Sequence, residues 1–186
     1  MNTCIALFRG INVGGNNLLP MKELVAILEG LGMRKVKTYI QSGNAVFQTT
    51  EKDLSQLSGK ITTEIRDRHG FEPYLLILGP EDLKRVIEEN PFPEAETDPG
   101  NLHLCFLAAR PDHPDLEKLS RLKKESERFQ LTDRVFYLHA PEGVGRSKLA
   151  ASVGKLLGVP STDRNWSTVC KIMDMVEESR VMPASR

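Results

Sequence analysis

The first part of the chain shows a regular succession of strand-like and helix-like patterns. Apolar residues fill positions 4–8, and Met21, Leu24, Val25 and Leu28 then recur at the spacing of an amphipathic helix. Ser42-Gly43-Asn44 separates two further apolar runs and is typical of a hairpin. The predicted elements are strands over 3–9, 36–41, 45–50 and 74–78, and helices over 21–31 and from Leu54 to about Gly70. This βαββαβ order is that of a ferredoxin-like half, which places the first and third strands at the centre of the sheet and the 42–44 turn on the same side as the loop after the first strand.

The rest of the chain is patterned less regularly. Strands are predicted over 102–108 and 134–139, an extended piece over 162–166, and helices over 81–89, 114–128, 147–157 and 168–178. The charged run from Lys118 to Arg128 is interpreted as the solvated face of one of these helices, which carries Leu116, Leu119 and Leu122 inward. We therefore predict an α+β fold of two ferredoxin-like halves, the first regular and the second rearranged. The predicted division is 1–79 for the first half, 80–100 for a helix and linker, and 101–186 for the second half.

A glycine-rich run follows the first predicted strand, from Arg9 and Gly10 through Asn12 to Gly14 and Gly15. Backbone N–H groups of such a strand–loop–helix can converge on an anion, and Arg9 would add a guanidinium. The glycines and asparagines can equally do no more than form the turn. The run matches neither the dinucleotide-binding nor the Walker A pattern, so it names no particular nucleotide.

A second glycine-rich segment repeats this chemistry. Gly143 and Gly145 free the backbone, Ser147 is placed to cap a helix, and Arg146 and Lys148 bring positive charge to its start. Two cations at the positive end of a helix are unfavourable unless an anionic ligand or an acidic neighbour offsets them. Further on, Arg164 and Asn165 precede the last helix, for which Ser167 or Thr168 is the expected cap and Met173 one of the expected buried residues. We predict one anion-attracting surface formed by Arg9, Gly10, Asn12, Gly14, Gly15, Gly143, Gly145, Arg146, Ser147, Lys148, Arg164 and Asn165.

Four segments also resemble the signature of a bacterial family of proteins of unknown function. They are Arg9 to Gly15, Thr38 to Asn44, Gly143 to Leu149, and Thr162 to Val169. The resemblance implies a small, soluble, cytoplasmic bacterial protein with an α+β fold built from ferredoxin-like halves. It implies no established activity, cofactor or catalytic residue.

Composition narrows the classes of partner. The 25 basic and 25 acidic residues cancel, which argues against a protein that coats nucleic acid or a membrane through bulk charge. No apolar run approaches the ~20 residues of a membrane span, so we expect no membrane partner. The histidines and cysteines show no metal-ligand spacing, so we expect no metal, and the cofactor, if any, is unspecified.

The three cysteines are odd in number and far apart, which suits unpaired, mostly buried thiols in a reducing cytoplasm. Only Cys105 has a candidate base nearby, because His103 lies two residues away on the same face of a strand. The leading hypothesis is a cytoplasmic protein that binds phosphate, a nucleotide, RNA or another anionic ligand. An enzyme of unknown reaction and a protein-interaction module are the alternatives.

Overall fold

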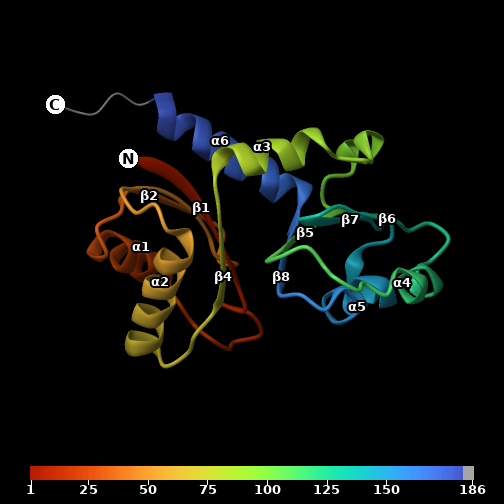
Figure 1. Ribbon diagram of the computed structural model, residues 1–186, viewed down its shortest axis with the longest axis horizontal. Helices are drawn as coiled ribbons and strands as arrows, with labels where there is room; N and C mark the ends of the chain where they lie inside the picture. The colour runs from red at the N-terminus through yellow and green to blue at the C-terminus, as the bar shows by residue number, and fades with distance from the viewer. Residues whose placement is uncertain (182–186) are drawn as a thin grey trace. The chain divides into compact units, whose positions relative to one another are not determined.

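The computed structural model describes residues 1–181. Its strands are β1 (Asn2–Arg9), β2 (Arg34–Tyr39), β3 (Asn44–Thr49), β4 (Tyr74–Leu78), β5 (Leu102–Leu107), β6 (Arg128–Leu131), β7 (Val135–His139) and β8 (Ser161–Asn165). Its helices are α1 (Met21–Gly30), α2 (Leu54–His69), α3 (Pro80–Glu88), α4 (Leu116–Leu122), α5 (Lys148–Leu157) and α6 (Trp166–Val181). Figure 1 follows this order along the ribbon. No helix of this part of the chain is long and apolar enough to cross a membrane.

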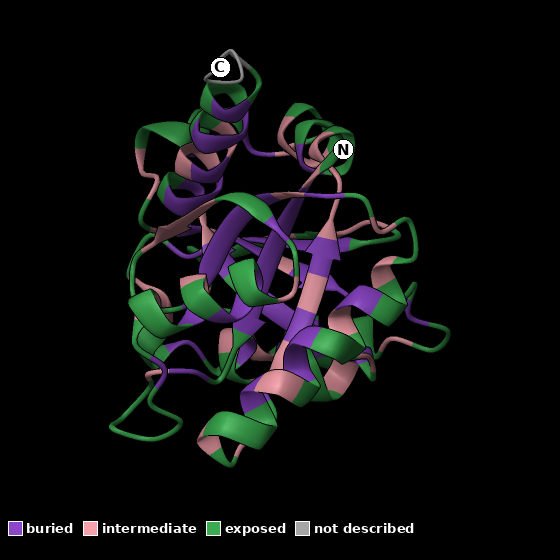
Figure 2. Cartoon of the chain, turned by 90° about the vertical axis from the view of Figure 1, so that its left-hand side faces the viewer, coloured by how far each residue is buried: buried purple, intermediate pink, exposed green. Residues whose placement is uncertain are grey.

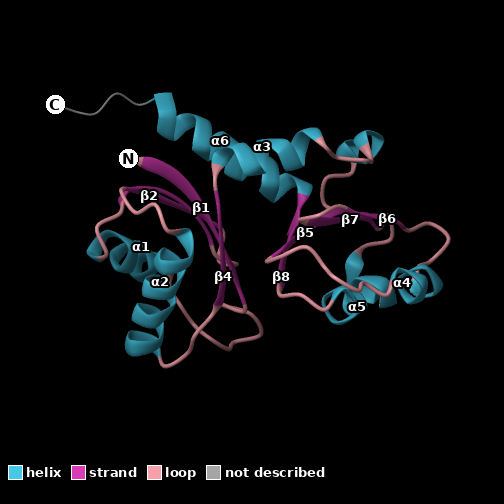
Figure 3. Cartoon of the chain, in the orientation of Figure 1, coloured by secondary structure: helices cyan, strands magenta, loops and turns pink. Residues whose placement is uncertain are grey.

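The chain folds into two compact units. Unit 1 combines Met1–Arg85 with the chain from Lys171 onward, and unit 2 is the continuous stretch Val86–Cys170. Each unit contains one four-stranded sheet, as Figure 3 shows in magenta. The predicted division at residues 79 and 101 stays a prediction.

Unit 1 has the strand order β2-β3-β1-β4, and every pair is antiparallel. The prediction of a ferredoxin-like half with its first and third strands at the centre is therefore confirmed. Alternate residues of β1, among them Ala6 and Phe8, pack with Leu24 of α1 and Ile61 of α2. Figure 2 shows the result: the central strands β1 and β3 are largely buried, while the outer faces of the helices are exposed.

Unit 2 repeats this topology. Its elements β5, α4, β6, β7, α5 and β8 form an antiparallel sheet of order β6-β7-β5-β8, again with the first and third strands at the centre. Two ferredoxin-like halves are thus confirmed, but the second is not rearranged as predicted. The strand that the sequence failed to reveal is β6.

The predicted helix over 114–128 hides that strand. Helix α4 ends at Leu122, and the N–H of Glu127 then donates to the carbonyl of Lys124 (3.1 Å) in a tight turn. Phe129 of β6 stacks on Phe136 of β7 with ring centroids 5.1 Å apart and packs against the core of unit 2. Packing of the partly buried Phe129 therefore overrides the helix propensity of the charged run before it. Leu116, predicted to point inward, is 40% exposed, whereas Leu119 is fully buried.

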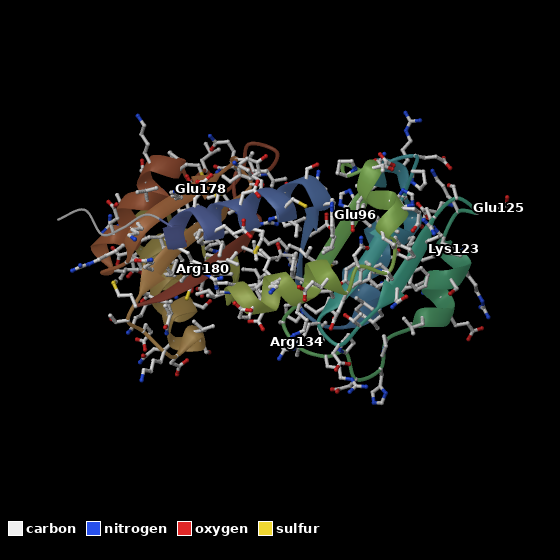
Figure 4. All side chains as sticks on the ribbon, turned by 90° about the horizontal axis from the view of Figure 1, so that it is seen from above. Glu96, Lys123, Glu125, Arg134, Glu178 and Arg180 are labelled. Atoms are coloured by element: carbon white, nitrogen blue, oxygen red, sulfur yellow. The ribbon has the colours of Figure 1, made fainter. Side chains whose placement is uncertain are left out.

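Helix α6 begins two residues before the predicted start. The side-chain oxygen of Asn165 accepts a hydrogen bond from the N–H of Thr168 (3.0 Å), so Asn165 caps the helix rather than Ser167 or Thr168. Towards its other end, Glu178 and Arg180, both labelled in Figure 4, pair with Lys37 (2.9 Å) and Glu81 (3.1 Å) of unit 1. The helix buries Met175 where Met173 was predicted.

Candidate functional site

The first glycine-rich run folds into a small hairpin between β1 and α1. The N–H of Asn16 donates to the carbonyl of Val13 (3.0 Å), and between them Gly14 and Gly15 have φ angles of 59° and 77°. Two central residues with positive φ are what a type I′ turn requires, and glycine adopts them without strain. These two glycines are therefore explained by the turn itself.

Asn12 holds this hairpin to the neighbouring β2–β3 turn. Its side-chain oxygen accepts from the N–H of Leu19 (2.8 Å), and its amide group donates to the carbonyls of Leu19 and Gln41 (2.9 Å each). The N–H of Phe8 also donates to the carbonyl of Gly43 (2.9 Å). These contacts confirm that the 42–44 turn lies beside the first glycine run. They also commit the Asn12 side chain to the protein backbone.

Arg9 ends β1 and is exposed. Its guanidinium carbon lies 5.5 Å from the ring centroid of Tyr74, its neighbour across the sheet on β4. A cation over an aromatic face is attracted by the ring, which holds Arg9 at the surface beside the hairpin.

Three exposed aliphatic residues lie in the hairpin, directly after it, and in the β2–β3 turn. Val13 is 62% exposed, Leu18 63% and Ile40 47%. Ile40 also has a φ of 50°, a left-handed conformation that is strained for a β-branched residue. We call Val13, Leu18 and Ile40 the apolar cluster. The sequence did not lead us to predict this cluster. The pattern that could have indicated it is the presence of apolar residues within a run rich in glycine and asparagine.

The second glycine-rich segment forms a short 3₁₀ helix, Val144–Arg146, that leads into α5. Gly143 takes a φ of 82° at its start, and the Ser147 hydroxyl accepts from the N–H of Ala150 (2.9 Å). Ser147 therefore caps α5, as predicted.

Arg146 and Lys148 flank this cap and are both exposed. Neither makes an ion pair or a hydrogen bond through its side chain within residues 1–180, and the first turn of α5 contains no acidic residue. Nearby, Lys124 differs: it lies 2.9 Å from Glu142, the residue before Gly143. Within the described residues, the two cations at the start of α5 therefore lack an acidic partner that would offset them.

Arg164 and Asn165 are placed differently. Arg164 is 7% exposed and donates to the Thr162 hydroxyl (2.9 Å) and the Asp163 carbonyl (2.6 Å) of its own strand. Burial lowers the pKa of Arg164 to about 10, although the charge of Asp163 works in the opposite direction. Arg164 is thus stabilised inside the protein, and Asn165 is occupied as the cap of α6.

The alternation along β8 also separates Arg164 from the start of α5. Asp163 lies opposite Cys105 in the β5–β8 register, and Cys105 packs on the side of the sheet that α5 covers. Successive side chains of a strand point to opposite faces, so Arg164 faces the other side. Arg9 and Arg146 belong to different units. The single surface that joins them stays a prediction.

The sequence did not reveal a pair formed by His103 and Asp163. The ring Nδ1 of His103 lies 2.7 Å from the Asp163 carboxylate, and Nε2 lies 3.1 Å from the carbonyl of Gly100. Burial works against the charged ring, but the hydrogen bond and charge of Asp163, with the Gly100 carbonyl, outweigh it and raise the pKa of His103. Sixty positions separate the two residues, so only the strand register brings them together.

This pairing bears on the cysteines. Both ring nitrogens of His103 face oxygen acceptors, so His103 is not placed as a base for Cys105. All three cysteines are thiols, as predicted, but only Cys4 is fully buried, and burial raises the pKa of its thiol. Within residues 1–181 no cluster of His, Cys, Asp and Glu could hold a metal ion.

Comparison with known proteins adds family and fold. No curated protein matches the chain. A solved structure described as a conserved bacterial protein, SP0830 from Streptococcus pneumoniae, is similar over 94% of this chain and 98% of its own, with a TM-score of 0.69 and 28% sequence identity. A family model matches residues 1–137, which include the segments Arg9 to Gly15 and Thr38 to Asn44 but not the two later ones. The chain therefore belongs to DUF1697, a family of proteins of unknown function.

Proposed function

We propose that the segment Gly143–Lys148 binds a phosphate-bearing anionic ligand. The observation that carries the proposal is the start of α5, where Arg146 and Lys148 are exposed and have no acidic partner in the described part of the chain. Each cation there is unfavourable by a few tenths to about 1 kcal/mol when it is exposed at a helix N-terminus. A bound anion would reverse the sign of that interaction.

The local backbone supports the same role. The 3₁₀ turn Val144–Arg146 leads directly into a helix of ten residues, so N–H groups of its first turn point towards the segment. Arg146 can add a bidentate contact to phosphate oxygens, and Lys148 a point charge. Ser147 is already used as the cap, so it positions the helix and is not the group that we expect to touch the ligand.

Phosphate and mononucleotides fit this small site better than long nucleic acid. The zero net charge of the chain favours a short anionic ligand, because proteins that bind long nucleic acid gain affinity from many phosphate contacts. The thiol state of the cysteines suits the cytoplasmic location that the sequence predicts.

The test is calorimetry with inorganic phosphate, a nucleoside monophosphate and a short single-stranded RNA. We compare wild type with Arg146→Gln and Lys148→Gln, and use Lys155→Gln in the last turn of the same helix as the matched control. A charge-assisted hydrogen bond contributes roughly 1.5–3 kcal/mol, so each site variant should bind about tenfold to a hundredfold more weakly. Failure of all three ligands to bind wild type, or equal losses in the control, would remove the proposal.

The variant Arg9→Gln tests separately the prediction that Arg9 and Arg146 contribute to one anion-attracting surface. If Arg9 and Arg146 contribute to one surface, Arg9→Gln should weaken binding as much as Arg146→Gln does. If only the unit 2 variants respond, the site is confined to the segment Gly143–Lys148.

A further inference from the structure

We propose that the apolar cluster of unit 1, Val13, Leu18 and Ile40, is a docking surface for a partner protein that presents an apolar segment flanked by carboxylates. The proposal is independent of the anion site, because it concerns different residues in a different unit. It assigns a function to the first glycine-rich run, in which the side chain of Asn12 is already used within the protein.

One residue, Asn12, links the backbone segments that carry the three side chains. Asn12 bonds to the backbone of Leu19 and of Gln41, which directly follow Leu18 and Ile40, and Val13 is its own neighbour in the chain. Among the described residues, five large hydrophobic side chains are exposed, and three of them are in this cluster. Exposed apolar residues scattered singly are ordinary, whereas a contiguous group on a monomer marks an interaction site.

The conformation of Ile40 adds an independent observation. Its φ is 50°, which is strained for this residue type, and its side chain is 47% exposed. Backbone strain and exposure of an aliphatic side chain to water therefore occur at the same residue. Asparagine or glycine would relieve the strain at once. Strain of this kind persists at sites where a ligand or partner requires the side chain.

The chemistry of the surroundings identifies the partner. Residues 9–22 and 38–44 contain only two charged side chains, Arg9 and Lys22, and both are cations. The next carboxylate along the chain, Glu23, lies 3.0 Å from His69. A centre with few charges and a cationic edge fits an apolar segment with carboxylates beside it.

The aliphatic character of the cluster favours a protein partner over single-stranded nucleic acid. Single-stranded nucleic acid is bound by stacking on aromatic rings, and the cluster is entirely aliphatic. The surface is also preorganised, because the I′ turn and the bonds of Asn12 already fix the hairpin. Little backbone conformational entropy is therefore lost when a partner docks.

The experiment uses fluorescence anisotropy with the full-length protein and three short labelled peptides. The peptides share the same leucine and isoleucine positions and carry Glu, Gln or Lys at the polar positions. We expect the Glu peptide to bind at least tenfold more tightly than the Lys peptide, and added salt to reduce the difference. Leu18→Ser and Ile40→Asn should each weaken the Glu peptide at least fivefold.

Leu116→Ser is the matched control, because Leu116 is exposed in unit 2 and far from Asn12 in sequence. It should leave peptide binding unchanged. Absence of binding, no preference between the Glu and Lys peptides, or equal losses in Leu18→Ser and Leu116→Ser would overturn the proposal. Light scattering provides a further check: self-association of wild type that Leu18→Ser abolishes would assign the surface to a second copy of the chain and overturn the proposed partner.

Discussion

Gly43 of the β2–β3 turn lies directly against Ile11, which follows β1. A Cβ atom on residue 43 would be 2.5 Å from Cδ1 of Ile11 and 2.7 Å from Cβ of Phe8. The φ of Gly43 is 87°, and its carbonyl accepts from the N–H of Phe8 (2.9 Å). Close approach and backbone conformation therefore both require glycine here, and they let the turn rest on the end of β1.

We expect Gly43→Ala to destabilise the protein by at least about 2 kcal/mol, because positive φ and steric overlap with a buried neighbour add together. Chemical denaturation measures the loss. Gly59→Ala is the control, since Gly59 is exposed in α2 and a Cβ there meets nothing within 4 Å. In a helix interior that change should stabilise by about 0.5–1 kcal/mol. Equal effects of the two variants would contradict this account of Gly43.

Asn12→Asp tests the link between the hairpin and the β2–β3 turn. The change keeps the shape of the side chain but turns the amide group, which donates to the carbonyls of Leu19 and Gln41, into an acceptor. The new carboxylate oxygen would face a carbonyl oxygen, and two acceptors cannot form a hydrogen bond. This should cost about 2 kcal/mol in the free energy of unfolding at neutral pH. The cost should shrink on acidification, when the new carboxyl group is protonated and can donate again.

Asn16→Asp makes the same charge change at the exposed tip of the hairpin. Its side chain takes no part in the link to Gln41, and only its backbone N–H closes the turn. We expect stability within about 0.5 kcal/mol of wild type. A loss in Asn16→Asp as large as that in Asn12→Asp would mean that the added charge, and not the lost donor, causes the effect.

The His103–Asp163 pair predicts a pH dependence of stability. The pKa of His103 is raised in the folded protein, so its contribution is fully present below the unfolded-state pKa of about 6.5 and is lost as pH rises through the folded value. Asp163 is half exposed, so we expect a change of only a few tenths to about 1 kcal/mol. Unfolding measured between about pH 5 and 9 should show the decline in wild type and a flatter profile in Asp163→Asn. His113→Gln, at an exposed histidine, should retain the wild-type slope.

Lys148→Glu should stabilise the protein in buffer without phosphate. A carboxylate in the first turn of α5 interacts favourably with the helix dipole where Lys148 does not, and the gain should be about 0.3–1 kcal/mol. Lys155→Glu, in the last turn of the same helix, should have the opposite sign. Thermal unfolding of both variants is the measurement. Destabilisation by both changes would show that the dipole does not determine stability at this helix.

Much of the fold was predictable because apolar periodicity marks strands and helices that have one buried face. The crossover from β1 to β2 also fixed where the 42–44 turn would lie, and the bonds between Asn12, Phe8 and this turn confirm it. Strand β6 escaped because it is four residues long and follows a charged run with high helix propensity. The sequence pattern that still indicates this strand is the apolar pair Phe129 and Leu131, which are two positions apart with a polar residue between them.

The candidate sites were harder to predict because they depend on contacts between distant segments. Sequence alone could pair His103 only with Cys105 on its own strand, whereas the register of β5 and β8 brings Asp163 to it. Arg164 looked like a ligand-binding cation, and strand alternation buries it instead. The exposure of Ile40 follows from its position in a turn held by Asn12, which no pattern of apolar residues encodes.

The division of the chain between its units sets an order for their completion during synthesis. Unit 2 is one uninterrupted stretch, whereas unit 1 recruits the chain from Lys171 onward. Lys37 and Glu81 leave the ribosome long before Glu178 and Arg180, the partners that they meet in the finished protein. Unit 1 is translated first and is therefore finished last, because the last residue of unit 2, Cys170, leaves the ribosome before the segment from Lys171 onward that unit 1 requires.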